Sequence, residues 1–175
     1  MKLSWSHKLF LFVNKWAGKS RVYDVVVKFW AEYALFLLAL AVVASILWQS
    51  PHIGAVIFVF VWLPLMWTAG MGISWLIGWA YPHRRPAIEF PKTHQIITPL
   101  SNWKSLPSDH AFSAWLLVFA AVVGLRGEGA LGLMAVFTAS AALISAARVL
   151  AGVHYPRDVV AGTVLAGVVA WAFFG

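Results

Sequence analysis

The feature that most constrains this chain is a long stretch, residues 33–83, that contains no Lys, Arg, Asp or Glu. Soluble domains carry about one charged residue in four, so a stretch of this length is typical of a bilayer-embedded segment. Its main polar interruption is Gln-Ser-Pro-His at residues 49–52, a composition typical of a tight turn. The stretch is therefore predicted to form two membrane spans, residues 31–49 and 53–81.

Three more apolar runs follow, at residues 109–125, 129–147 and 158–174. With 62% hydrophobic and 11% charged residues, the 175-residue chain has no room for a separate soluble module. We expect one domain over residues 1–175, an all-α integral membrane protein with about five transmembrane helices. Two spans separate the loops 82–107 and 148–157, so both are predicted on the same membrane face. Long loops on rigid scaffolds tend to carry function.

The first 30 residues differ from the rest because charges are frequent in them. Residues 22, 25, 26, 29 and 30 are apolar and share one helical face, while residues 21, 24 and 28 are charged and lie on the other. This pattern predicts an N-terminal interfacial amphipathic segment, residues 1–30, lying on the membrane surface.

Composition also limits the chemistry. The absence of Cys excludes disulfides, iron–sulfur clusters and thiolate metal sites. Lys and Arg outnumber Asp and Glu by 13 to 6. In a membrane protein this surplus indicates phosphate head groups rather than nucleic acid as the partner.

Residues able to bind a phosphate gather on the face of the two loops. Arg85 and Arg148 come from different segments and can together hold a phosphoryl group. Arg84 can join them or anchor a helix end among head groups. Ser108 stands where a helix is predicted to begin, where free backbone N–H groups favour an anion.

Two histidines on the same face can perform the chemistry. His154 precedes Asp158 by four positions, one helical turn, so the carboxylate can accept the imidazole N–H and leave the other ring nitrogen free to attack phosphorus. His110 lies in the turn that Ser108 begins.

These residues resemble three sequence blocks of the type 2 phosphatidic acid phosphatase (PAP2) superfamily. The first block ends in Arg-Pro, matched by Arg85-Pro86, but Gly78 stands where the family has lysine. The second is Pro-Ser-Gly-His, matched at 107–110 with Asp109 in place of glycine, and the third is matched by Arg148, His154 and Asp158, with Ala147 in place of serine. Within the superfamily the chain looks most like the bacitracin-resistance type of undecaprenyl diphosphate phosphatase, which often lacks the first-block lysine.

The resemblance implies a PAP2-like helical bundle and a metal-independent phosphatase without cofactor. His154 would be the nucleophile that forms a phosphohistidine, Asp158 its orienting partner, and His110 the proton donor. Arg84, Lys92 and Lys104 are candidates to supply the charge missing at Gly78.

The resemblance further implies undecaprenyl diphosphate as substrate and the outer face of a bacterial inner membrane as the location of the site. Phosphatidic acid, phosphatidylglycerophosphate and lipid A phosphates stay open as substrates, because nothing in the sequence measures the lipid tail. The positive-inside rule favours the opposite orientation, since most Lys and Arg residues lie on the catalytic face. A protein that binds or flips lipid phosphates without hydrolysis is the alternative from another functional class.

Overall fold

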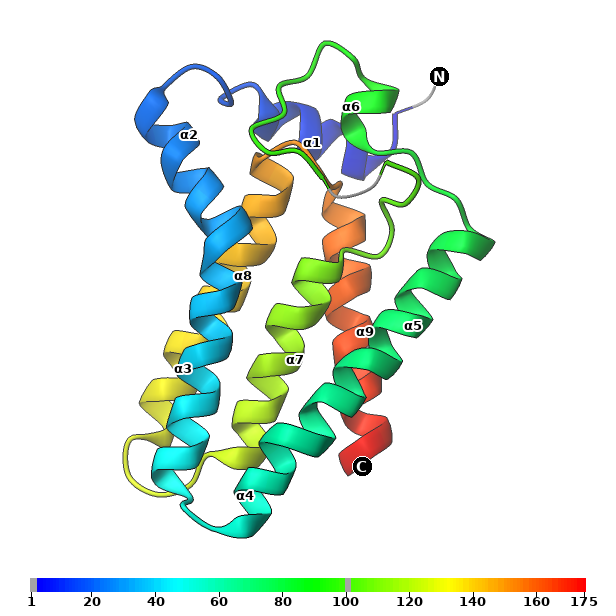
Figure 1. Ribbon diagram of the computed structural model, residues 1–175. Coiled ribbons are helices and arrows are strands. Elements are labelled where there is room, and N and C mark those ends of the chain that lie inside the picture. The colour runs from blue at the N-terminus through cyan, green and yellow to red at the C-terminus, as the bar shows by residue number, and fades with distance from the viewer. Residues whose placement is uncertain (1–2, 100–101) are drawn as a thin grey trace.

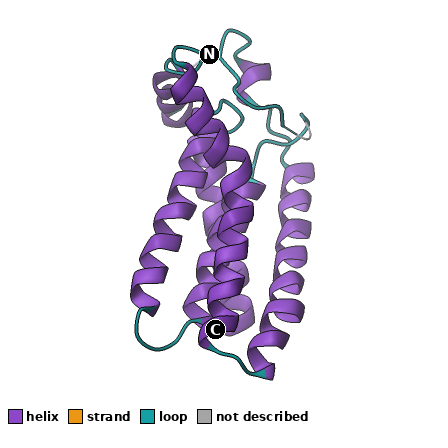
Figure 2. Cartoon of the chain, turned by 60° about the vertical axis from the view of Figure 1, so that its left-hand side comes forward, coloured by secondary structure: helices purple, strands orange, loops and turns teal. Residues whose placement is uncertain are grey.

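The described residues, 3–99 and 102–175, are helices and loops without a strand in the computed structural model. The helices are α1 (Trp5–Asn14), α2 (Arg21–Lys28), η1 (Phe29–Tyr33), α3 (Ala34–Gln49), α4 (Ile53–Ile57), η2 (Phe58–Trp62), α5 (Leu63–Ala80), α6 (Pro86–Glu89), α7 (Asp109–Gly124), α8 (Ala130–Leu150) and α9 (Pro156–Phe174). The all-helical fold predicted from the sequence is confirmed (Figures 1 and 2).

The first two long helices each contain one π-helical turn, η1 and η2. Pro64 lies two residues after the end of η2. A proline ring clashes with the carbonyl four residues earlier in a regular α-helix, and here that carbonyl, of Phe60, lies in the wider turn, which accommodates the ring. Neither Gly nor Pro interrupts residues 21–49. The segment 21–30, predicted as separate and interfacial, is therefore the beginning of a single helix that runs through η1 into α3.

Helix α7 is the centre of the bundle. Its buried residues lie all around its axis, and they pack against α3, α5, α8 and α9. The outer helices instead expose large apolar side chains; Trp48 is 87% exposed and Leu131 is 81% exposed. Apolar side chains that face outward on a bundle of this kind are typical of contact with lipid.

Within the described residues, four helical segments are long and apolar enough to cross a membrane: residues 21–49, 53–80, 130–150 and 156–174. The fifth apolar helix, α7, has 16 residues, which span about 24 Å. This is shorter than a bilayer core of about 30 Å. Figure 1 shows that α7 begins below the upper ends of α8 and α9, so the residues at its start lie inside the end of the bundle.

The loops 82–107 and 148–157 lie at one end of the bundle together with α1, and the C terminus lies at the other (Figure 1). Helix α1 crosses this end and is hydrogen-bonded to both loops. The Asn14 side chain donates to the His94 carbonyl (2.7 Å) and accepts from the His94 N–H (3.0 Å), and Ser6 accepts from the Arg157 N–H (3.1 Å). The polar residues singled out from the sequence are thereby held on one scaffold.

Candidate active site

His154 lies in the short connection between α8 and α9. Its backbone N–H and that of Val153 both donate to the Arg148 carbonyl (3.3 Å each), and Pro156 then begins α9. The turn is tight because Gly152 has a φ of +83°, and a Cβ there would lie 2.3 Å from the His94 carbonyl oxygen. These constraints fix the backbone that carries the imidazole. His154 as a whole residue is 3% exposed.

The surroundings of His154 determine its tautomer. Nδ1 lies 2.9 Å from the carbonyl oxygen of Ser105, which can only accept, so Nδ1 carries the proton. Nε2 is then unprotonated and lies 3.3 Å from the Arg85 guanidinium. Burial, with the positive charges of Arg148 and Arg85, lowers the pKa of His154 to about 4, although Asp158 opposes this shift. At neutral pH the ring is a neutral base with its lone pair on Nε2.

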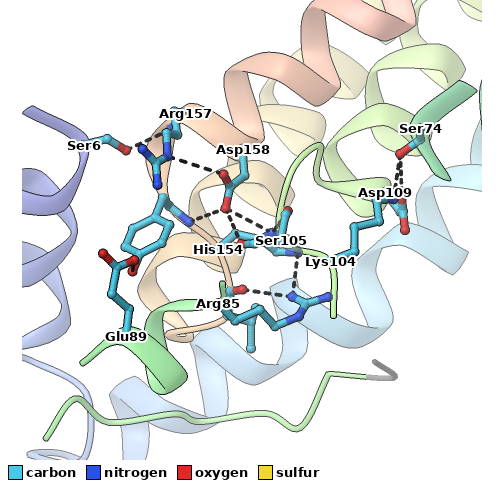
Figure 3. A network of polar contacts seen from close by, with 12 residues as sticks. Ser6, Ser74, Arg85, Glu89, Lys104, Ser105, Asp109, His154, Arg157 and Asp158 are labelled. Atoms are coloured by element: carbon cyan, nitrogen blue, oxygen red, sulfur yellow. Dashed lines mark hydrogen bonds and ion pairs between the residues drawn. The ribbon is translucent and has the colours of Figure 1, made fainter. Parts of the chain in front are cut away.

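Asp158 is completely buried beside His154, but the contact differs from the direct hydrogen bond expected from the sequence. Its Oδ2 lies 3.6 Å from Nδ1 and accepts hydrogen bonds from the Ser105 hydroxyl (2.5 Å) and the Tyr155 N–H (2.8 Å). Ser105 therefore links the two residues, since its carbonyl accepts from His154 and its hydroxyl donates to Asp158 (Figure 3). Asp158 acts on the ring mainly as a nearby charge.

Arg85 comes from the loop and immediately precedes α6. One of its NH groups donates to the Val153 carbonyl (2.9 Å), and the side chain is buried next to His154. The guanidinium is thus fixed where it can neutralise charge on a group bound at Nε2.

Arg148 lies in the last turn of α8 and is 5% exposed. It donates to the Ala31 carbonyl (2.8 Å), which belongs to the π-helical turn η1. Its Nε is buried and has no hydrogen-bond partner among the described residues. Buried donors of this kind are rare, and an oxyanion is a natural acceptor for this one.

Ser108 precedes α7 and is completely buried, and its hydroxyl also has no partner within residues 3–99 and 102–175. Its N–H donates to the Asp158 carbonyl (2.9 Å), which binds the start of α7 to α9. Gly162 allows this approach, because a Cβ on it would lie 2.5 Å from the Ser108 carbonyl oxygen. The half-buried ring of His110 follows, within electrostatic reach of Arg85, Arg148 and His154.

Six of the seven residues predicted from the sequence therefore surround one site: His154, Asp158, His110, Arg85, Arg148 and Ser108. The seventh, Arg84, has an exposed side chain, and no hydrogen bond or ion pair joins it to another described residue. Sequence reasoning did not identify Ser105, because its main contribution is a backbone carbonyl, nor the role of the Ala31 carbonyl.

A second polar group lies beside this site. Lys104, Asp109 and Ser74 form a closed set of contacts from the loop, the start of α7 and the middle of α5 (Figure 3). Among the described residues no group of three or more His, Asp or Glu could hold a metal ion.

The arrangement combines a neutral imidazole whose Nε2 lone pair faces the Arg85 guanidinium, a second histidine nearby and buried donors suited to an oxyanion. The family model of the PAP2 superfamily matches residues 60–175, which include every site residue except Ala31. The chain belongs to the PAP2 superfamily. The motif resemblance noted from the sequence is thus confirmed at the level of the superfamily.

Individual proteins are also similar to this chain. A curated relative, the bacitracin transport permease protein BcrC of Bacillus licheniformis, is 27% identical over 89% of this chain and 72% of its own length. The crystal structure of Aquifex aeolicus LpxE is similar with a TM-score of 0.71 and 21% identity, over 98% of this chain and 95% of that one.

A PAP2-type phosphatidylglycerolphosphate phosphatase from Bacillus subtilis is similar with a TM-score of 0.67 and 17% identity, over 95% and 84% of the two chains. At these identities the solved structures show a shared fold. The shared fold agrees with the four described helices that are long and apolar enough to cross a membrane.

Proposed function

We propose that the chain is a membrane lipid phosphatase that uses His154 as its nucleophile and forms a phosphohistidine. The observation that carries the proposal is the tautomer of His154. The Ser105 carbonyl holds the proton on Nδ1, so the Nε2 lone pair points at Arg85, whose N–H donates to it until a phosphoryl group takes that place.

The reaction has two steps. Nε2 of His154 attacks the terminal phosphorus in line, the bond between phosphorus and the leaving oxygen breaks, and His110 gives its proton to that oxygen. Water then attacks the phosphohistidine, His110 takes the water proton, and inorganic phosphate leaves with the Nε2 lone pair restored. Arg85 and Arg148, with the Ser108 hydroxyl, stabilise the phosphoryl oxygens in both steps.

The substrate we propose is undecaprenyl diphosphate, converted to undecaprenyl phosphate and inorganic phosphate during recycling of the cell-wall lipid carrier. Two observations support it: the sequence resemblance to bacitracin-resistance phosphatases, and the similarity to a relative whose name links it to bacitracin. The alternative substrates are phosphatidylglycerophosphate, phosphatidic acid and lipid A phosphates. The similarity to the B. subtilis phosphatidylglycerolphosphate phosphatase gives a reason to test the first of these.

The direct test uses purified protein in detergent with a chelator present. We expect release of inorganic phosphate from undecaprenyl diphosphate, faster than from phosphatidic acid or phosphatidylglycerophosphate, and loss of release in His154→Ala. A clear preference for a glycerolipid would overturn the substrate assignment while leaving the phosphatase assignment intact. Full release by His154→Ala would overturn the mechanism.

The second candidate is a lipid-phosphate binding or flipping protein, and the word permease in the name of the B. licheniformis relative gives a reason to test it. The same buried arginines would bind the head group in that case. Protein reconstituted in vesicles distinguishes the two: movement of a labelled lipid phosphate between leaflets without release of inorganic phosphate supports the flipping protein.

We propose further that the site faces the outside of a bacterial inner membrane. The C terminus lies at the end of the bundle opposite the site, so it would be cytoplasmic. A reporter fused after Gly175 tests this directly. A reporter that functions only in the cytoplasm should be active there, and activity of an extracytoplasmic reporter would reverse the orientation.

A further inference from the structure

Gly78 and Lys104 fit each other across the interface between α5 and the loop. Gly78 lies on the buried face of α5, which also presents Ser74. A Cβ on Gly78 would lie 2.6 Å from Cγ and 2.7 Å from Cδ of Lys104. The lysine stem therefore occupies the space that a side chain at position 78 would need, and only glycine leaves it free.

The ammonium group of Lys104 is fixed by two partners. Nζ donates to Asp109 Oδ1 (2.5 Å) and to the Ser74 hydroxyl (2.7 Å), and that hydroxyl donates to the same Asp109 oxygen (2.7 Å). An ammonium has three N–H groups, so one remains after these two bonds. Lys104 is 3% exposed, whereas the Asp109 side chain is 35% exposed. The cation is thus buried and supported from α5 and α7.

Lys104 lies on the same site as the arginines. Figure 3 shows it between the Arg85 and His154 group and the Asp109 and Ser74 pair. Its neighbour Ser105 is the residue that holds His154. Burial lowers the pKa of Lys104, Asp109 opposes that shift, and the charge of Arg85 lowers it further. Lys104 and Arg85 are both buried and Asp109 balances the charge of Lys104, so an anion bound between the two cations would lower the cost of burying them close together.

From this geometry we propose that Lys104 binds the phosphoryl group of the substrate from the α5 side, and that Gly78 and Asp109 are the residues that make its position possible. The proposal rests on the proposed phosphatase function. It joins two departures from the family motif, the glycine at 78 and the aspartate at 109, into one change: the cation comes from the loop, fills the space above Gly78 and is held by Asp109.

The test measures kcat/KM for undecaprenyl diphosphate and the inhibition constant of inorganic phosphate. Lys104→Met should lower kcat/KM and raise that inhibition constant, each by about 10- to 100-fold, the range for a lost hydrogen bond to a charged group. Lys8→Met is the control, because Lys8 is an exposed lysine of α1 at the same end of the bundle, and it should behave as wild type.

Two double variants separate a phosphate contact from other roles. Gly78→Lys with Lys104→Ala places a lysine stem in the vacated space and should recover about 10-fold in kcat/KM over Lys104→Ala alone. Lys104→Met with Asp109→Asn should stay as impaired as Lys104→Met. Thermal unfolding in detergent shows which variants are folded.

The proposal is overturned if Lys104→Met leaves kcat/KM and the inhibition constant of phosphate unchanged. It is also overturned if adding Asp109→Asn to Lys104→Met restores wild-type activity, which would mean that the lysine only neutralises Asp109. A third contrary result is that Gly78→Lys recovers no activity in Lys104→Ala. The failure of the proposed function is distinguishable, because it appears as no phosphate release by the wild-type protein or as full release by His154→Ala, whatever the Lys104 variants do.

Discussion

Replacement of Asp158 by asparagine separates the charge of this residue from its geometry. The asparagine carbonyl can take the position of Oδ2 and still accept from Ser105 and Tyr155. The proton on Nδ1 of His154 stays in place, because the Ser105 backbone carbonyl that accepts it is unchanged. Only the negative charge 3.6 Å from the ring is lost.

The magnitude follows from that distance. A full charge on the ring at 3.6 Å from the carboxylate is worth about 5 kcal/mol at an effective dielectric constant of about 20. If about half of the charge has developed when Nε2 bonds to phosphorus, the variant loses about 2 kcal/mol of transition-state stabilisation, or roughly 30-fold in kcat.

Phosphate release from undecaprenyl diphosphate measures the effect, with Glu128→Gln, an exposed carboxylate at the opposite end of the bundle, as control. Triads in which the carboxylate itself fixes the tautomer lose about 10⁴-fold on the same change. A loss of that size in Asp158→Asn, or no loss, would refute the role assigned to the Ser105 carbonyl.

Three further predictions use other parts of the site. Protonation of His154 removes its lone pair, so kcat/KM should fall as the pH drops through about 4, the pKa of this ring. A pH profile in which the acid limb that belongs to His154 lies near 6.5 would contradict the buried neutral ring. Gly162→Ala should cost about 1–3 kcal/mol and lower both Tm and kcat/KM, because its Cβ meets the Ser108 carbonyl at 2.5 Å, whereas Gly167→Ala, whose nearest atom is 3.7 Å away, should match wild type in both measurements. Ser108→Ala should lower kcat/KM by about 3- to 10-fold without lowering Tm, since the buried hydroxyl has no partner among the described residues; a clear drop in Tm would show that it supports the fold instead.

The arrangement of the helices was largely predictable from the sequence. A bilayer requires long apolar runs, and charged residues or proline mark their ends. Four of the five apolar helices therefore begin and end within three residues of their predicted bounds. The exception is the first, which begins at Arg21 rather than at residue 31. Amphipathic patterning predicts a helix at 21–30 but does not show whether this helix is separate from the first membrane span. The two are continuous because residues 29–33 form a π-helical turn instead of a break.

The candidate site was predictable where chemistry depends on residue type and not where it depends on the backbone. Motif spacing predicted that His154, His110, Arg85 and Arg148 lie together, because in the proposed mechanism each of them acts through its own side chain. The carbonyls of Ser105 and Ala31 have no sequence signature, since every residue has one. The pairing of Lys104 with Gly78 likewise depends on a loop folding onto α5, and a sequence spacing of 26 residues does not predict it.

The most direct test of the account is detection of the phosphorylated enzyme. Undecaprenyl diphosphate labelled in its terminal phosphate is mixed with the protein, the reaction is quenched with base within milliseconds, and the labelled peptide is identified by mass spectrometry. We predict an acid-labile, base-stable phosphate on His154, formed before steady-state release of inorganic phosphate and absent from His154→Ala. Label on another residue, or full turnover by His154→Ala, would contradict the claim that His154 is the nucleophile.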